Sequence, residues 1–168
     1  MCPEMAFPLI AFSRPEGADS DRETFGFVSD LDHLQRARRR EIRTSEMLGM
    51  VVIDSAGAAW RIQALKVVRR RTPLWQCVLM TVFPQWDDIE YEVDLSLEGL
   101  PAVTFPEVQA RVCRSIDLNP DDWVDDEAMA GEAGEPVTLE YLMETAKSAV
   151  LRSTDIETMR IGIHAALP

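Results

Sequence analysis

The sequence predicts an α+β fold, in which an antiparallel sheet of about five strands fills the first two thirds of the chain and C-terminal helices pack on it. Two apolar runs, residues 47–53 and 60–68, flank the turn sequence DSAG, a pattern typical of a β-hairpin. Residues 89–97 alternate between apolar and polar side chains, as in a strand with one buried face and one face in water. Beyond Pro101 the apolar residues recur at helical spacing instead.

The segment before the hairpin contains two shorter predicted strands and one helix. Residues 5–13 form the first strand, and Pro8 confines it to a sheet edge or a strand start. Residues 24–28 form the second strand. Ser29, with Asp32 three residues later, then resembles the start of a helix of about a dozen residues with a basic outer face.

A further strand is predicted over residues 74–83, before the alternating strand at 89–97, and four helices follow these strands. Capping residues and apolar spacing predict these helices at residues 104–116, 121–130, 138–151 and 155–165. We therefore expect a single domain over residues 1–168, strand-rich over 1–100 and helical over 101–168.

Composition and length favour a soluble globular protein. With 168 residues, 46% of them hydrophobic and 27% charged, the chain can bury a sizeable core. No apolar run approaches the roughly 20 residues of a membrane helix, and no basic residue precedes Arg14, as it would in a signal peptide. We expect a cytoplasmic protein that does not contact membranes. Its 15 Arg and 2 Lys indicate GC-rich bacterial coding.

Reactive and metal-binding residues are few and scattered. The three cysteines, Cys2, Cys77 and Cys113, form no close pair, which argues against a disulfide framework and a zinc site. The two histidines, His33 and His164, have no neighbouring Cys or acidic metal ligand, and no glycine-rich phosphate loop is present. We predict no catalytic residue, no cofactor and no metal.

The formal net charge of −12 is concentrated in the second half of the chain. Residues 1–86 contain 12 basic and 10 acidic side chains, a net charge of +2, whereas residues 87–168 contain 5 basic and 19 acidic, a net charge of −14. Such an acidic half repels nucleic acids and anionic lipids and steers a basic protein toward itself. It predicts a basic protein partner or a homo-oligomer, and no nucleic acid.

The segment after Asn119 contains the main candidate binding residues. Its sequence, DDWVDDE, surrounds one tryptophan with carboxylates. Tryptophan is a frequent hot spot in protein interfaces, and acidic neighbours speed association with a basic partner. The predicted partner-binding residues are Trp123, Asp121, Asp122, Asp125 and Asp126, with a second patch of Trp86, Asp87 and Asp88. The alternative for Trp123 is a place in the core beneath its own helix.

The DDxxD spacing in this segment is similar to the aspartate-rich motif with which isoprenoid synthases hold magnesium and a diphosphate. Those enzymes are large all-helical bundles with a second motif facing the first, and this chain is too short and too rich in strands. We interpret the carboxylates as the surface of an acidic helix in water, whose first-turn Asp residues are favoured by the helix dipole.

Two other groups of charged residues allow alternative functions. An arginine cluster, residues 36–43 and 69–71, is a candidate phosphate or RNA site, but it lacks interleaved aromatic residues. Pairing with the chain's own carboxylates is the simpler interpretation. Glu90, Glu92 and Asp94 share one strand face and are candidates for an acid and a base, although an ordinary surface is the simpler interpretation there too.

Three hypotheses about function follow. The first is a non-enzymatic cytoplasmic bacterial protein that binds another protein through its acidic C-terminal surface, similar in composition only to immunity, antitoxin or adaptor proteins. The second is a small-molecule-binding protein or enzyme with a carboxylate-lined pocket between sheet and helices. The third is a structural homo-oligomer. No motif in the sequence distinguishes these hypotheses. Light scattering, co-purification and ligand screening do.

Overall fold

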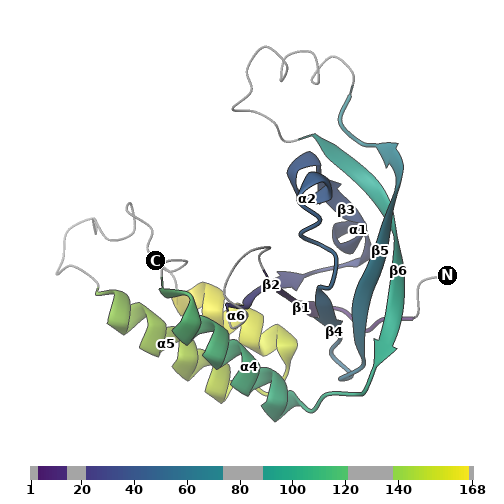
Figure 1. Ribbon diagram of the computed structural model, residues 1–168. Coiled ribbons are helices and arrows are strands. Elements are labelled where there is room, and N and C mark those ends of the chain that lie inside the picture. The colour runs from purple at the N-terminus through teal and green to yellow at the C-terminus, as the bar shows by residue number, and fades with distance from the viewer. Residues whose placement is uncertain (1–3, 15–21, 74–88, 121–137, 167–168) are drawn as a thin grey trace.

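The computed structural model of the chain describes residues 4–14, 22–73, 89–120 and 138–166 (Figure 1). Its strands are β1 (Leu9–Ser13), β2 (Thr24–Val28), β3 (Arg36–Arg38), β4 (Val51–Ile53), β5 (Ala59–Arg70) and β6 (Glu90–Leu100). Its helices are α1 (Leu31–Leu34), α2 (Arg39–Arg43), α4 (Phe105–Leu118), α5 (Leu139–Arg152) and α6 (Ile156–Ala166). The α+β prediction is confirmed, and the described residues form a sheet of 6 strands where about five were expected.

The strands form one antiparallel sheet in the order β2-β1-β4-β5-β6-β3. The two edge strands, β2 and β3, are joined by the short connection 29–35, which also contains α1. The sheet therefore curls strongly, and α1 and α2 lie on its concave side (Figure 1). The pairing of β3 with β6 continues into the connection, where the Val93 N–H donates to the Gln35 carbonyl at 2.9 Å.

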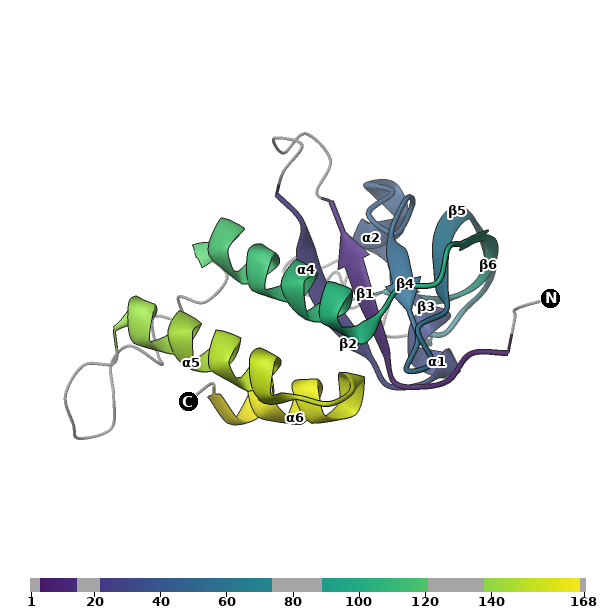
Figure 2. The same ribbon diagram turned by 90° about the horizontal axis from the view of Figure 1, so that it is seen from below.

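Strand β1 is buried on both of its faces. Leu9 and Ala11 belong to a core on the concave side, which also contains residues of α1, β4, β5 and β6. Ile10 and Phe12 point the opposite way, into a second core with α4, α5 and α6. In Figure 2 these three helices form a layer of their own beside β1 and β2. The uninterrupted apolar sequence LIAF is what a strand covered on both sides requires.

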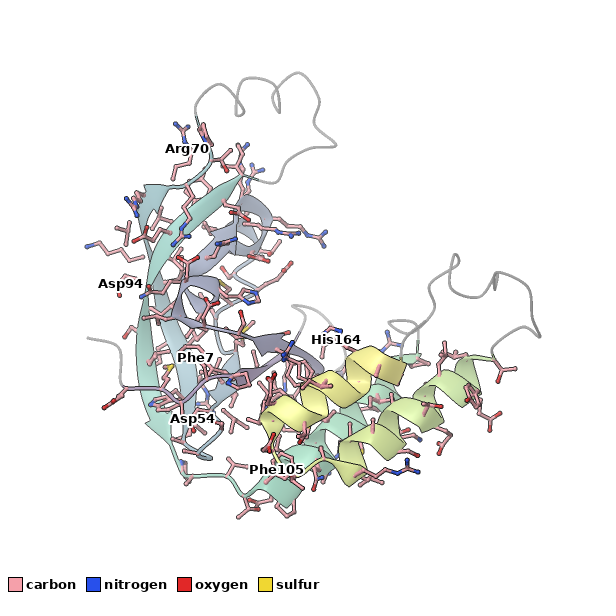
Figure 3. The ribbon with its side chains drawn as sticks, turned by 180° about the vertical axis from the view of Figure 1, so that it is seen from behind. Phe7, Asp54, Arg70, Asp94, Phe105 and His164 are labelled. Carbon is pink, nitrogen blue, oxygen red and sulfur yellow. The ribbon has the colours of Figure 1, made fainter. Side chains whose placement is uncertain are left out.

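The long β5–β6 hairpin has one face in the core and one face in water, as the alternation over residues 89–97 predicts. Val93 and Leu95 are buried in the concave core. Asp94 is exposed on the outer face of the sheet (Figure 3). Opposite charges are neighbours on that face, since Lys66 pairs in register with Asp94 and Arg69 with Glu92. Cross-strand pairs of this kind stabilise a sheet modestly.

The turn between β4 and β5 is organised by the buried carboxylate of Asp54, which is only 4% exposed. It accepts hydrogen bonds from the backbone N–H groups of Ala56 and Ala58, both at 2.9 Å, and from that of Ala6 at 3.2 Å. A buried carboxylate without such donors would be strongly unfavourable. The predicted hairpin is confirmed, and its turn also holds the chain just before β1.

Gly57 in the same turn holds the connection that leads to α4. Its φ is +83°, a conformation that L side chains rarely adopt, and its carbonyl accepts a hydrogen bond from the Val103 N–H at 2.8 Å. The hairpin turn therefore helps to position the start of the C-terminal helices.

The prediction of one helix of about a dozen residues after residue 28 is wrong. Two short helices, α1 and α2, replace it, and β3 separates them. Asp30 rather than Ser29 caps α1, by accepting a hydrogen bond from the His33 N–H at 2.7 Å. Residues 36–38 extend because they pair with residues 90–92 of β6, and this pairing overrides the helical propensity of the arginine-rich sequence. The strand predicted at 74–83 and the helix predicted at 121–130 lie outside the described residues.

The other three C-terminal helices begin where the sequence predicts. The Glu107 carboxylate accepts hydrogen bonds from the backbone N–H and the hydroxyl of Thr104, both at 2.7 Å, as a capping box requires. The Thr138 hydroxyl accepts from the Tyr141 N–H at the start of α5. The apolar stripes of α4, α5 and α6 all enter the core that contains Ile10 and Phe12.

Replacing Gly57 with Ala should lower the free energy of unfolding by roughly 2–4 kcal/mol, because positive φ and overpacking both act against a side chain there. A Cβ at this position would lie 2.5 Å from the Val103 carbonyl oxygen. Urea denaturation measures the effect. Gly49→Ala is the matched control: its φ is +80° but its surroundings are open, so only the conformational strain of about 1–2 kcal/mol applies. Equal losses in the two variants would contradict the role given to Val103.

Candidate functional site

The residues that the sequence proposes for partner binding all lie outside the described residues. This applies to the main group and to the smaller patch alike: Trp123, Asp121, Asp122, Asp125, Asp126, Trp86, Asp87 and Asp88. The structure does describe where the main segment is attached. Asn119 ends α4 before it, and Thr138 caps α5 after it, so both of its ends meet the helical layer.

The acidic excess of the second half belongs chiefly to the same segment. Residues 121–137 contain 7 acidic and no basic side chains, half of the net −14 of residues 87–168. The helices α4, α5 and α6 together contain 5 acidic and 5 basic side chains, a net charge of zero. These three helices therefore have no net charge, and much of the acidic excess lies in the sequence that links α4 to α5.

Helices α5 and α6 expose large apolar side chains. Tyr141 is 63% exposed and Leu151 67% exposed on α5, and Ile161 is 54% exposed on α6. The opposite stripes of the same helices are buried, for example at Val150 and Met159. Single exposed apolar residues are ordinary, and these three are candidates for contact with another molecule because they lie on two packed helices.

The protein's own carboxylates pair with residues of the arginine cluster, as the simpler interpretation of the sequence predicts. The Asp32 carboxylate receives hydrogen bonds from Arg36 at 2.7 Å and from both terminal nitrogens of Arg71. These hydrogen bonds, the one from Arg71 first, lower the pKa of Asp32 to about 2. The network joins α1, β3 and the end of β5 near Arg70 (Figure 3).

Two of the three strand-face carboxylates that the sequence offered as an acid and a base are also engaged with cations. Glu92 pairs with Arg69 at 2.5 Å, and Glu90 lies 3.8 Å from Arg36. Asp94 faces water on the outer side of the hairpin (Figure 3). None of these three carboxylates lines either of the clefts described next.

A cleft of about 790 Å³ lies between the sheet and the start of α4. Its floor contains Phe12, Val51 and Arg61, which the strand register places next to one another on β1, β4 and β5. Its walls come from residues 48–49, the connection 101–103 and the first turns of α4, which begins at the labelled Phe105 in Figure 3. The second hypothesis from the sequence placed Glu90, Glu92 and Asp94 in a pocket between sheet and helices, but none of them lines this cleft. Its charged lining residues are instead three arginines and two glutamates: Arg14, Arg61, Arg111, Glu23 and Glu107.

One wall of this cleft is fixed by a network that joins α4 to β2. The Arg111 guanidinium donates two hydrogen bonds to the Glu23 carboxylate, both at 2.7 Å, and lies 4.0 Å from the centre of the Phe12 ring. The Glu23 carbonyl accepts from the Ser115 hydroxyl at 2.6 Å and from the Asn119 amide at 2.8 Å. The second half of α4 and its C-cap are therefore tied to the residue that precedes β2.

The charge of Glu23 is stabilised by its arginine partners. Burial acts first and would raise the pKa of Glu23. The hydrogen bonds and charge of Arg111, together with the charge of Arg14, outweigh burial and lower the pKa below its ordinary value. Glu23 is thus a carboxylate that has both of its oxygens occupied, and it is not a candidate acid or base.

A second cleft of about 720 Å³ lies on the other face of β1 and β2, against α1 and α2. Met47 and Met50 supply apolar walls, and the exposed His33 lines it too. Its arginines are engaged with acidic neighbours, as Arg40 is with Glu46 at 3.7 Å. The cleft follows the edge of the concave core. Among the described residues, no hydrogen bond or ion pair orients a polar group toward its centre.

Other reactive residues are isolated in the part of the chain that is described. Cys113 is half-buried against the helical core, and burial raises the pKa of its thiol, which keeps it protonated. His164 is exposed on α6 (Figure 3). Across residues 4–14, 22–73, 89–120 and 138–166, no three side chains of metal-binding type come together. None of the helices in those ranges is long and apolar enough to span a bilayer.

The chain matches no known protein family, no functionally characterised protein and no solved structure. The cleft and the Glu23–Arg111 pair are the features that sequence reasoning missed. Glu23 and Arg111 are separated by 88 positions, and neither belongs to a local motif. Only the fold brings them together.

Replacing Glu23 with Gln should lower the free energy of unfolding at pH 7 by roughly 1–3 kcal/mol, because two charge-assisted hydrogen bonds to Arg111 lose their acceptor charge. A lowered folded-state pKa means that the stabilisation is complete above the ordinary pKa of 4.5 and is lost as the pH falls through the folded-state pKa. The difference between wild type and variant should therefore shrink in acid, as measured by urea denaturation at several pH values.

Glu98→Gln is the control, since it removes the same charge from a half-exposed pair with Arg61 at 3.6 Å. Its effect at pH 7 should stay below about 1 kcal/mol. An equal loss in both variants, or a Glu23→Gln loss that persists at low pH, would contradict the role given to the Arg111 pair.

Proposed function

We propose that this protein acts by binding another protein, and that the binding surface is formed by residues 121–137 together with the exposed sides of α5 and α6. The observation that carries the proposal is the exposure of Tyr141, Leu151 and Ile161 on helices whose other faces are fully used in the core. Such side chains favour an apolar contact area, and an aromatic residue at the start of α5 is a suitable anchor.

Charge supports a basic partner. Residues 121–137 have a net charge of −7 and are attached between α4 and α5, next to Tyr141. The carboxylates of residues 90–98 lie beside arginines and a lysine, whereas the sequence supplies no cation within 121–137. Concentrated negative charge beside an apolar contact area accelerates association with a positively charged protein and makes it dependent on salt.

The proposal is tested by affinity capture from the native host followed by measurement with the purified partner. Wild-type protein should capture a basic protein more strongly at an ionic strength of about 0.05 M than at about 0.5 M, because salt screens the carboxylates. Replacing Tyr141 with Ser should weaken the isolated complex about tenfold or more, as expected for an aromatic anchor. Neutralising Asp121, Asp122, Asp125 and Asp126 as Asn should mainly lower the association rate and its salt dependence.

Val68→Ser is the matched control, because Val68 is 56% exposed on β5, away from the C-terminal helices. It should leave the affinity within about twofold of wild type. A partner whose binding ignores salt and all of the C-terminal substitutions would contradict the proposal. Capture of nothing in either salt, with light scattering that shows a stable homo-oligomer, would favour self-association instead.

A further inference from the structure

The cleft between the sheet and α4 combines an apolar floor with an accessible cation, and this combination goes beyond the proposed protein-binding role. Phe12 and Val51 lie in one register row with Arg61, and Leu100 and Val103 add apolar surface beside them. We propose that this cleft binds a small molecule that carries one carboxylate on an apolar body, with Arg61 as the residue that holds the carboxylate.

The charges that line the cleft distinguish Arg61 from its neighbours. Arg111 already gives two hydrogen bonds to Glu23, and Glu107 is committed to the cap of α4. Arg61 instead lies 3.6 Å from Glu98, and the two side chains are 49% and 44% exposed. An exposed pair of this kind contributes little, so exchanging Glu98 for a ligand carboxylate is inexpensive. Arginine also suits a carboxylate by geometry, since its nitrogens match the two oxygens.

The balance of charge selects the class of anion. Three arginines and two glutamates line the cleft, a net charge of 3 − 2 = +1, in a protein whose net charge is −12. The site is therefore locally positive but flanked by carboxylates, which disfavour a doubly charged phosphate more than a monocarboxylate. Arg14, with a side chain 68% exposed and 3.6 Å from Glu23, lies at the same cleft and adds a second positive group.

The size and lining of the cleft require an apolar body. A volume of about 790 Å³ is within the range of small-molecule sites, in which most of the lining is apolar and a few polar groups set the orientation. Acetate would satisfy Arg61 but leave the surface of Phe12, Val51 and Leu100 in water. A carboxylate with a chain or ring of several carbons would cover that surface, and its affinity should increase with the apolar area that it buries.

Octanoate is the probe, and calorimetry together with ¹H–¹⁵N NMR on the full chain are the measurements. Octanoate should bind with a Kd on the order of 1 mM, as expected for a ligand of this size, and should shift the amide signals of Val51, Arg61 and Val103. Octanamide, which keeps the chain and loses the charge, should bind at least about fivefold more weakly, and acetate should give no measurable binding. Arg61→Gln should weaken octanoate about tenfold, because the charge is lost while part of the stem remains.

Lys66→Gln is the matched control, since it removes one exposed cation from the same strand outside the cleft. It should leave octanoate affinity within about twofold of wild type. Three results would overturn the proposal: octanamide binding as tightly as octanoate, equal losses in the Arg61 and Lys66 variants, or no octanoate binding at about 10 mM. Circular dichroism of both variants confirms that each is folded, which an exposed position on β5 leads us to expect.

Discussion

The burial of β1 on both faces is the constraint on which the rest of the structure depends. Leu9, Ile10, Ala11 and Phe12 are each at most 7% exposed, and they alternate between the two cores. A strand of this kind has no face left for water, so both groups of helices are needed to cover it. The curled sheet and α1 supply one cover, and α4, α5 and α6 supply the other.

This arrangement determines where ligands can reach the protein. Where α4 leaves the sheet, the register row of Phe12, Val51 and Arg61 is left partly open, and the cleft is the result. The Glu23–Arg111 pair attaches α4 to the residue before β2 and also forms part of the cleft wall. The same interaction therefore shapes the cleft and positions the helical layer. The outer sides of α5 and α6, by contrast, take no part in the core. They expose apolar side chains, and the most acidic part of the sequence links α4 to α5, which together are the basis of the proposed protein-binding role.

Sequence reasoning works well in this protein where the signal is local. The alternation over residues 89–97, the DSAG turn and the capping residues Thr104 and Thr138 predict elements that the structure confirms, because each depends on neighbours within a few positions. Sequence reasoning fails where a residue far away in the sequence determines the local structure. Residues 36–38 extend only because β6 pairs with them, and Arg111 meets Glu23 only in the folded chain. The candidate cleft could not be predicted for the same reason: Phe12, Val51 and Arg61 become neighbours through strand register. The partner-binding residues around Trp123 stay a prediction, as they lie outside the described residues.

Native-state hydrogen exchange of wild type and Leu9→Ala tests the central role of β1 most directly. Leu9 belongs to the concave core, and its truncation should cost about 2–4 kcal/mol. If β1 couples the two cores, the amides of Val93 in β6 and of Val112 in α4 should lose protection by the same amount. Lower protection at Val93 with unchanged protection at Val112 would show that the helical layer is stable without the concave core, and would contradict this account.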